Sequence, residues 1–102
     1  MTLENASRSL AALGNPVRLS IFRLLVQAGT AGLNVGDIQR HMEIPASTLS
    51  HHLSNLAQAG LVQQTRQGRE IICTAEFKRM RDTVDFLTAE CCQGVALRDK
   101  AS

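Results

Sequence analysis

The chain has 102 residues, 44% of them hydrophobic, and a formal net charge of +2 at neutral pH. This length accommodates one domain with a single core and excludes two, so we expect residues 1–102 to form one domain. The weak net charge does not by itself indicate nucleic acid. With only three aromatic residues, all Phe, stacking on single-stranded bases is excluded as the main mode of contact.

Two helices are predicted before residue 29. The first has apolar residues at helical spacing that should form its buried face, namely Leu3, Ala6, Leu10 and Leu13. Pro16 suits the first turn of the second helix, where its missing N–H costs nothing. The second helix should be the most buried, because it carries a wide apolar stripe: Val17, Leu19, Ile21, Phe22, Leu24, Leu25 and Ala28.

A short third helix is predicted from Val35 to Met42, and a fourth begins at Pro45 and ends near Gly60. Proline biases the residue before it away from helical backbone, so the chain should turn sharply between the two helices. Two helices joined by a short turn are typical of a helix-turn-helix motif.

The fourth helix predicts a DNA-reading surface. Leu49, Leu53 and Leu56 form one apolar stripe. The other side carries small hydrogen-bonding groups that suit base edges and phosphate oxygens, and the predicted DNA contacts there are Ser47, Thr48, Ser50, His51 and Ser54. The alternative interpretation is an ordinary solvated polar face.

A two-stranded hairpin is predicted after the fourth helix. The apolar runs 61–62 and 71–72 flank the stretch 66–69, in which Gly68 supplies the turn. Arg66 and Arg69 at the tip would meet phosphates or enter the minor groove beside the fourth helix, unless the tip is merely solvated. The order helix, turn, helix, hairpin predicts a mainly α fold with a β-hairpin wing, a winged helix-turn-helix.

The last helix is predicted from Ala75 to Cys91. Its apolar residues alternate at spacings of three and four, which suits a partner helix, and they are Phe77, Met80, Val84, Leu87 and Cys91. A two-fold homodimer that presents paired reading helices to a palindromic site would follow. The tail, 95–102, is expected either to continue as a helix or to fray.

Cofactor, catalytic and targeting patterns are largely missing from the sequence. We find no Ser-His-Asp order, paired carboxylates or phosphate-binding glycine loop, so no enzyme is predicted. No run of about 18 apolar residues and no signal-peptide pattern occurs either. The protein is therefore expected to be cytoplasmic, without a membrane partner, and to keep Cys73, Cys91 and Cys92 as thiols.

Three stretches resemble the ArsR/SmtB winged-helix repressors, which sense metals and metalloids in bacteria. They are the entry to the second helix (11–21), the fourth helix with Ser50-His51-His52-Leu53, and Gly60-Leu61-Val62 followed by Arg66, Gly68 and Arg69. The resemblance implies a homodimer through the first and last helices that binds double-stranded operator DNA. It also implies that a ligand weakens this binding and releases transcription.

The sequence departs from the family at two known ligand sites. Asn34-Val35-Gly36 stands where arsenic sensors carry Cys-Val-Cys, and the last helix has no His for zinc. What remains is Cys91-Cys92, which resembles the branch with vicinal cysteines at the end of the last helix. Soft trivalent arsenic or antimony prefers such thiolate ligands.

Three interpretations of Cys91 and Cys92 remain open: metalloid sensing, packing in a dimer interface, and redox sensing. Neighbouring helical residues point about 100° apart, so the two sulfurs converge only if their rotamers turn inward or the helix loosens there. Cys73, about 25 Å away along a helix, is expected to be a buried strand residue. A cellular thiol, a water or a methyl group would complete the metalloid site.

The sequence thus predicts a repressor that releases its operator on binding trivalent arsenic or antimony at a metal site of Cys91 and Cys92, with no constitutive cofactor. A thiol-redox-responsive winged-helix regulator is the alternative. A module that uses the same fold for protein contacts is a third hypothesis.

Overall fold

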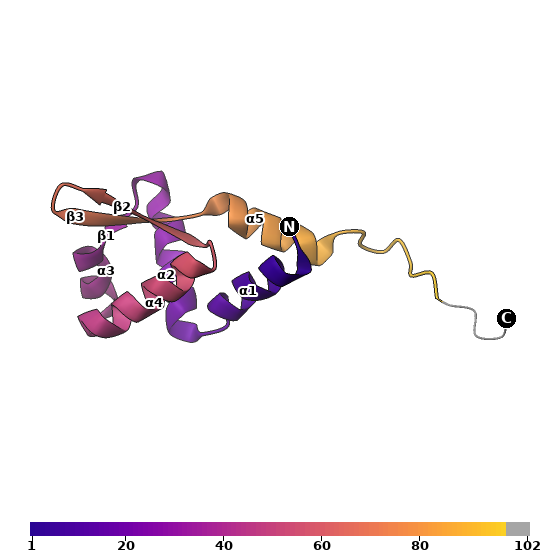
Figure 1. Ribbon diagram of the computed structural model, residues 1–102, viewed down its shortest axis with the longest axis horizontal. Helices are drawn as coiled ribbons and strands as arrows, with labels where there is room; N and C mark the ends of the chain where they lie inside the picture. The colour runs from indigo at the N-terminus through magenta and orange to yellow at the C-terminus, as the bar shows by residue number, and fades with distance from the viewer. Residues whose placement is uncertain (98–102) are drawn as a thin grey trace.

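Helices make up most of the fold, and one small sheet stands at one side of them (Figure 1). The computed structural model describes residues 1–97, so the predictions for 98–102 lie outside the described residues. The elements in chain order are α1 (Leu3–Leu13), α2 (Pro16–Ala28), η1 (Gly29–Ala31), β1 (Leu33–Asn34), α3 (Val35–Met42), α4 (Ala46–Gln58), β2 (Val62–Gln67), β3 (Glu70–Ala75) and α5 (Phe77–Thr88). The predicted winged helix-turn-helix is confirmed.

Side-chain caps fix where three of the helices begin. The Oγ1 of Thr2 accepts from the Asn5 N–H at 3.1 Å, which starts α1. Asn15 accepts from Arg18 N–H at 3.0 Å, and Pro16 occupies the first turn of α2 as predicted. Asn34 caps α3 in the same way. Each cap satisfies a backbone donor that the helix itself leaves without a partner.

The core lies between α2, α4 and the sheet, as the leucine stripe of α4 predicts. Its largest fully buried side chains are Ile21, Leu25, Ile38, Leu49, Leu53, Leu56, Leu61 and Cys73. The stripe on α2 is narrower than predicted, since Leu19 is 42% exposed. Leu19 lies roughly 160° around the helix from Ile21, which points into the core.

The buried face of α1 matches the predicted one only in part: Ala6 is buried and Leu13 packs against the core, but Leu3 and Leu10 do not. Small residues are buried there, namely Ala6, Ser9 and Ala12, whereas Leu3 and Leu10 are exposed. Small side chains let α1 approach α2 and α5, both of which it contacts. The two leucines therefore stand beside this contact rather than in it.

The sheet has three antiparallel strands in the order β1-β3-β2. The hairpin of β2 and β3 is confirmed, with Gly68 in the left-handed region (φ 64°) at its turn. Strand β1 was not predicted, because two residues carry no period. It is held by pairing with β3 and by the Asn34 amide, which donates to Glu70 at 3.1 Å.

Helix α5 is shorter at both ends than predicted. Ala75 is still paired with Val62 in the sheet, so the helix begins only at Phe77. It ends at Thr88, and Glu90 and Cys92 have left-handed backbone (φ 58° and 66°). The prediction that the helix reaches Cys91 is wrong, because a helix cannot continue through residues with positive φ.

No single helix within residues 1–97 has the length and apolar composition to cross a membrane. Only α1 taken together with 16–31 reaches that length, and the two segments are bent by 100°.

Candidate functional site

The exposed side of α4 carries every DNA contact predicted on that helix. Leu49, Leu53 and Leu56 fix the rotation of α4 by packing into the core. As a consequence the predicted contacts are all exposed: Ser47, Thr48, Ser50, His51 and Ser54. Gln58, which the prediction left out, is exposed one turn beyond Ser54 on the same side.

A tight turn sets α4 against α3. Glu43 takes a left-handed backbone (φ 54°), and its N–H closes the end of α3 on the Gln39 carbonyl at 2.8 Å. Ile44 packs against the core, and the Pro45 carbonyl accepts from the Leu49 N–H at 3.0 Å. The turn is therefore anchored at both ends, and the reading side of α4 is held in a fixed direction.

The wing brings more positive charge to this part of the molecule. Arg66, opposite Ile71 in the β2–β3 register, and Arg69, in the turn, are both exposed. Arg69 also lines a cavity of about 480 Å³ together with Arg40 and the start of α3. Arg40, which pairs with Asp37, was missed because nothing in the sequence places α3 beside the wing.

His51 and His52 differ in their surroundings although they are neighbours. His51 is exposed on the reading side, as predicted. His52 is half-buried; burial lowers its pKa, and the charge of Arg18 and then His51 add to the effect. His52 thus remains neutral near neutral pH and adds no charge to the surface.

Cys91 and Cys92 lie in a turn just beyond α5, and both are exposed. Their sulfur atoms are 2.8 Å apart. Cys92 has left-handed backbone, so the pair lies outside continuous helix, in which neighbouring side chains point about 100° apart. The thiol–thiol hydrogen bond raises the pKa of Cys91, so this group remains a thiol at neutral pH.

Cys73 is separate from this pair. It is buried in β3, as predicted, and its burial raises the pKa of its thiol, which accepts a hydrogen bond from Gln64. Within the part of the chain that the structure describes, no three His, Cys, Asp or Glu side chains come together as a metal site. Cys91 and Cys92 are therefore a two-sulfur donor set.

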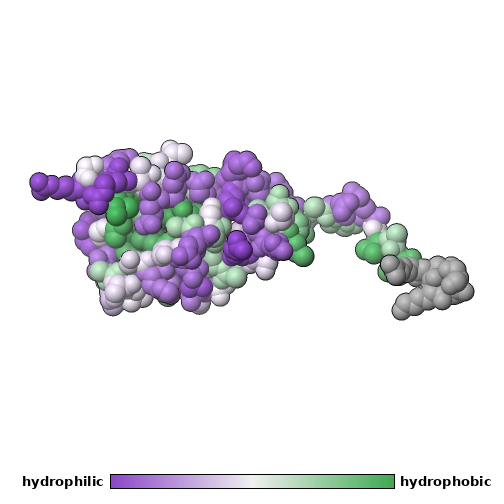
Figure 2. Space-filling model, viewed as in Figure 1, coloured by the Kyte–Doolittle hydropathy of each residue, from purple (hydrophilic) through white to green (hydrophobic). Residues whose placement is uncertain are grey.

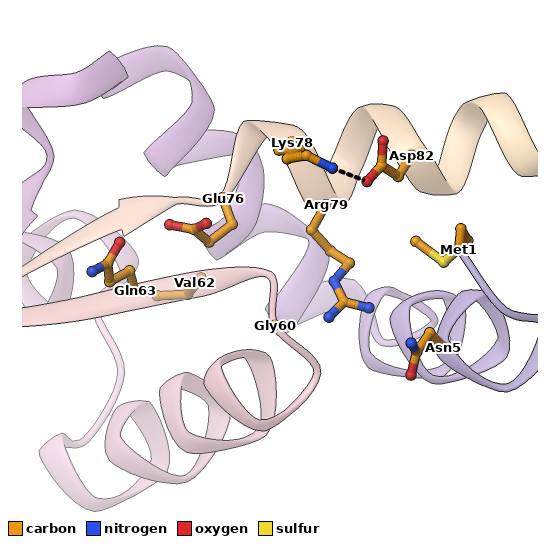
Figure 3. Close-up of a pocket in the computed structure, with 9 residues that line it drawn as sticks. All are labelled: Met1, Asn5, Gly60, Val62, Gln63, Glu76, Lys78, Arg79 and Asp82. Atoms are coloured by element: carbon orange, nitrogen blue, oxygen red, sulfur yellow. Dashed lines mark hydrogen bonds and ion pairs between the residues drawn. The ribbon is translucent and has the colours of Figure 1, made fainter.

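A polar cavity of about 630 Å³ lies between the start of α5, the start of α1 and the segment from Gly60 into β2 (Figure 3). Lys78 and Asp82 pair across one turn of α5 at 2.9 Å. Arg79 reaches over Gly60, the residue that follows the C-cap of α4. A Cβ on Gly60 would lie 2.8 Å from the Nη2 of Arg79, so a larger residue there would displace the guanidinium from this position.

Apolar side chains are exposed on α1 and α5, which are in contact with each other. Leu3, Leu10, Val84 and Leu87 are between 41% and 73% exposed. Figure 2 shows green, hydrophobic atoms at the end of the body where the tail leaves and along the tail itself. The predicted seam on α5 is thus divided: Phe77 and Met80 pack against the core, and Val84 and Leu87 face outwards.

Comparison with known proteins agrees with this geometry. The family described as a helix-turn-helix domain matches residues 13–65. An uncharacterized helix-turn-helix-type transcriptional regulator of Methanocaldococcus jannaschii is 37% identical over 64% of this chain and 71% of that protein. The transcriptional repressor SdpR of Bacillus subtilis is 30% identical over 74% of this chain and 81% of its own length.

One solved structure extends the likeness to nearly the whole chain. It is a homodimeric winged helix-turn-helix DNA-binding domain from Mycobacterium bovis, described as a possible ArsR-family transcriptional regulator. It superimposes with a TM-score of 0.70 at 25% identity, and the match covers 95% of this chain and 90% of that one.

Proposed function

Because the chain belongs to the ArsR/SmtB family of winged helix-turn-helix transcriptional regulators, we propose that it is a homodimeric repressor. In this proposal it binds operator DNA and releases it when trivalent arsenic or antimony binds Cys91 and Cys92. The observation that carries the ligand assignment is the convergence of two exposed sulfur atoms to 2.8 Å.

The DNA contacts we propose are those on the exposed side of α4 and on the wing. The α4 side chains would enter the major groove, where hydroxyl and imidazole groups can meet base edges. Arg66 and Arg69 would hold the backbone beside it through charge-assisted contacts to phosphate. Support comes from the rigid turn before α4 and from the exposure of all seven side chains.

The proposed dimer is formed by α1 and α5. Leu3, Leu10, Val84 and Leu87 would become buried there, and exposed apolar residues grouped on two touching helices are what a partner surface needs. The similar domain from Mycobacterium bovis is homodimeric, which supports a dimer for this chain. A two-fold axis would then present two α4 helices to successive major grooves.

The thiol pair suits a thiophilic, trivalent ligand. Two thiols condense with two hydroxyl groups of arsenous acid and release two water molecules, which leaves one hydroxyl on the arsenic. Soft ions prefer sulfur over the oxygen and nitrogen donors nearby. The third position keeps this oxygen ligand, or a cellular thiol or the methyl group of an organoarsenical occupies it, because residues 1–97 offer no third ligand there.

The start of α5 connects the Cys91–Cys92 site to α4, the helix that carries the proposed DNA contacts. Ligand binding would alter the turn at the end of α5, and α5 contacts the residue after the C-cap of α4 through Arg79 over Gly60. A shift of α5 along the dimer interface would therefore change the spacing of the two reading helices. A coupling of about 1–3 kcal/mol gives the 5- to 150-fold loss of affinity that release requires.

The same sulfur contact supports a second candidate, a thiol-redox regulator. Here the two thiols would form one disulfide, and a peroxide would accept the two electrons and two protons to become water and an alcohol or a second water. Redox-sensing cysteines usually have a lowered pKa, which provides the reactive thiolate. The raised pKa of Cys91 lowers the fraction of thiolate that would attack a peroxide.

Arsenite titration of the DNA-bound protein tests the proposal. We expect arsenite to release the wild-type protein and the Cys73→Ala control from a labelled duplex, with fluorescence anisotropy as the measurement. Cys91→Ser and Cys92→Ser should each remain bound, because one thiol cannot chelate. Undiminished release from both serine variants would show that Cys91 and Cys92 are not the arsenite site. Release by peroxide alone, reversed by a reductant, would favour the redox candidate.

A further inference from the structure

Two arginines from different helices line one cavity beside the end of α4. Arg8 of α1 and Arg18 of α2 line a cavity of about 280 Å³, together with Asn55 and Gln58 of α4. The other lining residues are Ala11, Ala12 and Ala59, so the cavity wall has no carboxylate. Within residues 1–97 the ion pairs are Arg40–Asp37 and Lys78–Asp82, and neither involves Arg8 or Arg18.

Arg18 is held in place by the fold. Its Nε donates to the Ala12 carbonyl at 2.7 Å. This hydrogen bond does not use the N–H groups on the two Nη atoms of the guanidinium. The backbone N–H of Arg18 is fixed in turn by the Asn15 cap at 3.0 Å. The guanidinium is therefore positioned before any ligand arrives, and a positioned donor loses less entropy on binding.

The cavity adjoins the side of α4 that carries the predicted DNA contacts. Gln58 lies one turn beyond Ser54 and two turns beyond His51, and all three are exposed. Asn55 lies next to Gln58 on the flank that faces Arg18. A DNA backbone that borders a major groove occupied by α4 would therefore pass this cavity.

The exposed leucines of α1, Leu3 and Leu10, lie on a different side of the helix from Arg8. Arg8 lies roughly 150° around the helix from Leu3 and Leu10 at about 100° per residue. A partner that covers the two leucines thus leaves Arg8 accessible. The charge at this position is available to DNA in the dimer as well as in one chain.

We propose that Arg8 and Arg18, with Asn55 and Gln58, form a binding site for a backbone phosphate of the DNA duplex. Guanidinium groups suit phosphate because they offer several N–H donors in a planar fork, and the two amides add neutral donors. The contact positions the reading helix and does not read sequence. It rests on DNA binding by the chain and not on the metalloid.

The test is the salt dependence of DNA binding by the full chain. The probes are a labelled duplex selected from a random pool by the wild-type protein and an unselected duplex. Arg8→Ala should reduce the slope of log affinity against log salt by about 1 per protomer. The loss of affinity per protomer should therefore be about fivefold larger at 0.15 M salt than at 1 M salt. The loss should be equal on both duplexes, because the contact is to phosphate, and Arg8→Lys should restore most of it.

Arg23→Ala is the matched control. It removes the same charge from an exposed position on α2 about 140° away from Arg18. Equal slopes for Arg8→Ala and Arg23→Ala would overturn the proposal, as would a loss confined to the selected duplex. A wild-type protein that selects no duplex from the pool and does not bind the unselected duplex would overturn DNA binding itself, and the two failures are therefore distinguishable.

Discussion

We expect the double variant Arg66→Ala, Arg69→Ala to bind operator DNA more weakly than the wild type. The loss of affinity should be about 30-fold larger per wing at 0.15 M salt than at 1 M salt. Each arginine that neutralises a phosphate releases a condensed cation, and two such contacts change the salt slope by about 1.8. A dimer carries two wings, so the combined loss is roughly 900-fold. Both side chains are exposed at the tip of the β2–β3 hairpin, so their removal should leave the core intact.

Fluorescence anisotropy over a series of salt concentrations measures this effect directly. The Arg66→Lys, Arg69→Lys double variant is the control, because it keeps both charges and changes only the geometry of the donors. It should retain nearly the wild-type slope. A double alanine variant whose slope equals that of the wild type would show that the hairpin tip is only solvated, which is the alternative that the sequence left open.

Leu53→Ala should destabilise the fold by about 2–5 kcal/mol. Leu53 is 1% exposed and lies in the core cluster where α4 meets α2 and the sheet, so its removal leaves a cavity. For a domain of this size the midpoint of thermal unfolding should fall by about 10 °C or more.

The neighbouring residue provides the control for stability. Ser54→Ala alters an exposed side chain and should change the free energy of unfolding by no more than about 0.5 kcal/mol. Circular dichroism during heating measures both variants. Similar melting temperatures for the two would contradict the burial of the leucine stripe, and with it the direction in which α4 presents its polar side.

The helix-turn-helix could be predicted because its signals are local. Pro45 marks the turn, and three leucines at helical spacing fix both the extent and the rotation of α4. The hairpin was predictable for the same reason, since Gly68 stands between two apolar runs. Strand β1 was not, because two residues pair only when β3 is already beside them.

The ends and faces of α1 and α5 depend on tertiary contacts. Apolar spacing placed Leu3 and Leu10 on the buried face of α1 with Ala6 and Leu13, whereas the fold leaves these two leucines exposed and buries Ser9 and Ala12 instead. Spacing also carried α5 through Cys91, although the helix ends at Thr88. The spacing of apolar residues shows which side chains are apolar. It does not predict where the backbone becomes left-handed, as it does at Glu90.

The candidate sites divide in the same way. The polar side of α4 and the thiol pair each come from one short stretch of sequence, so the sequence could propose both. The Arg8–Arg18 cavity and the contact of Arg79 with Gly60 join residues from separate helices and a turn. No spacing rule relates such residues, so only the folded chain brings them together.

Arsenic X-ray absorption spectroscopy on the arsenite-loaded protein, in buffer without added thiol, tests the central claim most directly. We predict one arsenic per chain with two sulfur ligands and one oxygen, because Cys91 and Cys92 form a two-sulfur donor set. The Cys73→Ala spectrum should be unchanged, and Cys91→Ser or Cys92→Ser should abolish the site. A three-sulfur spectrum that falls to two sulfurs in Cys73→Ala, or a spectrum with oxygen neighbours alone, would contradict the account.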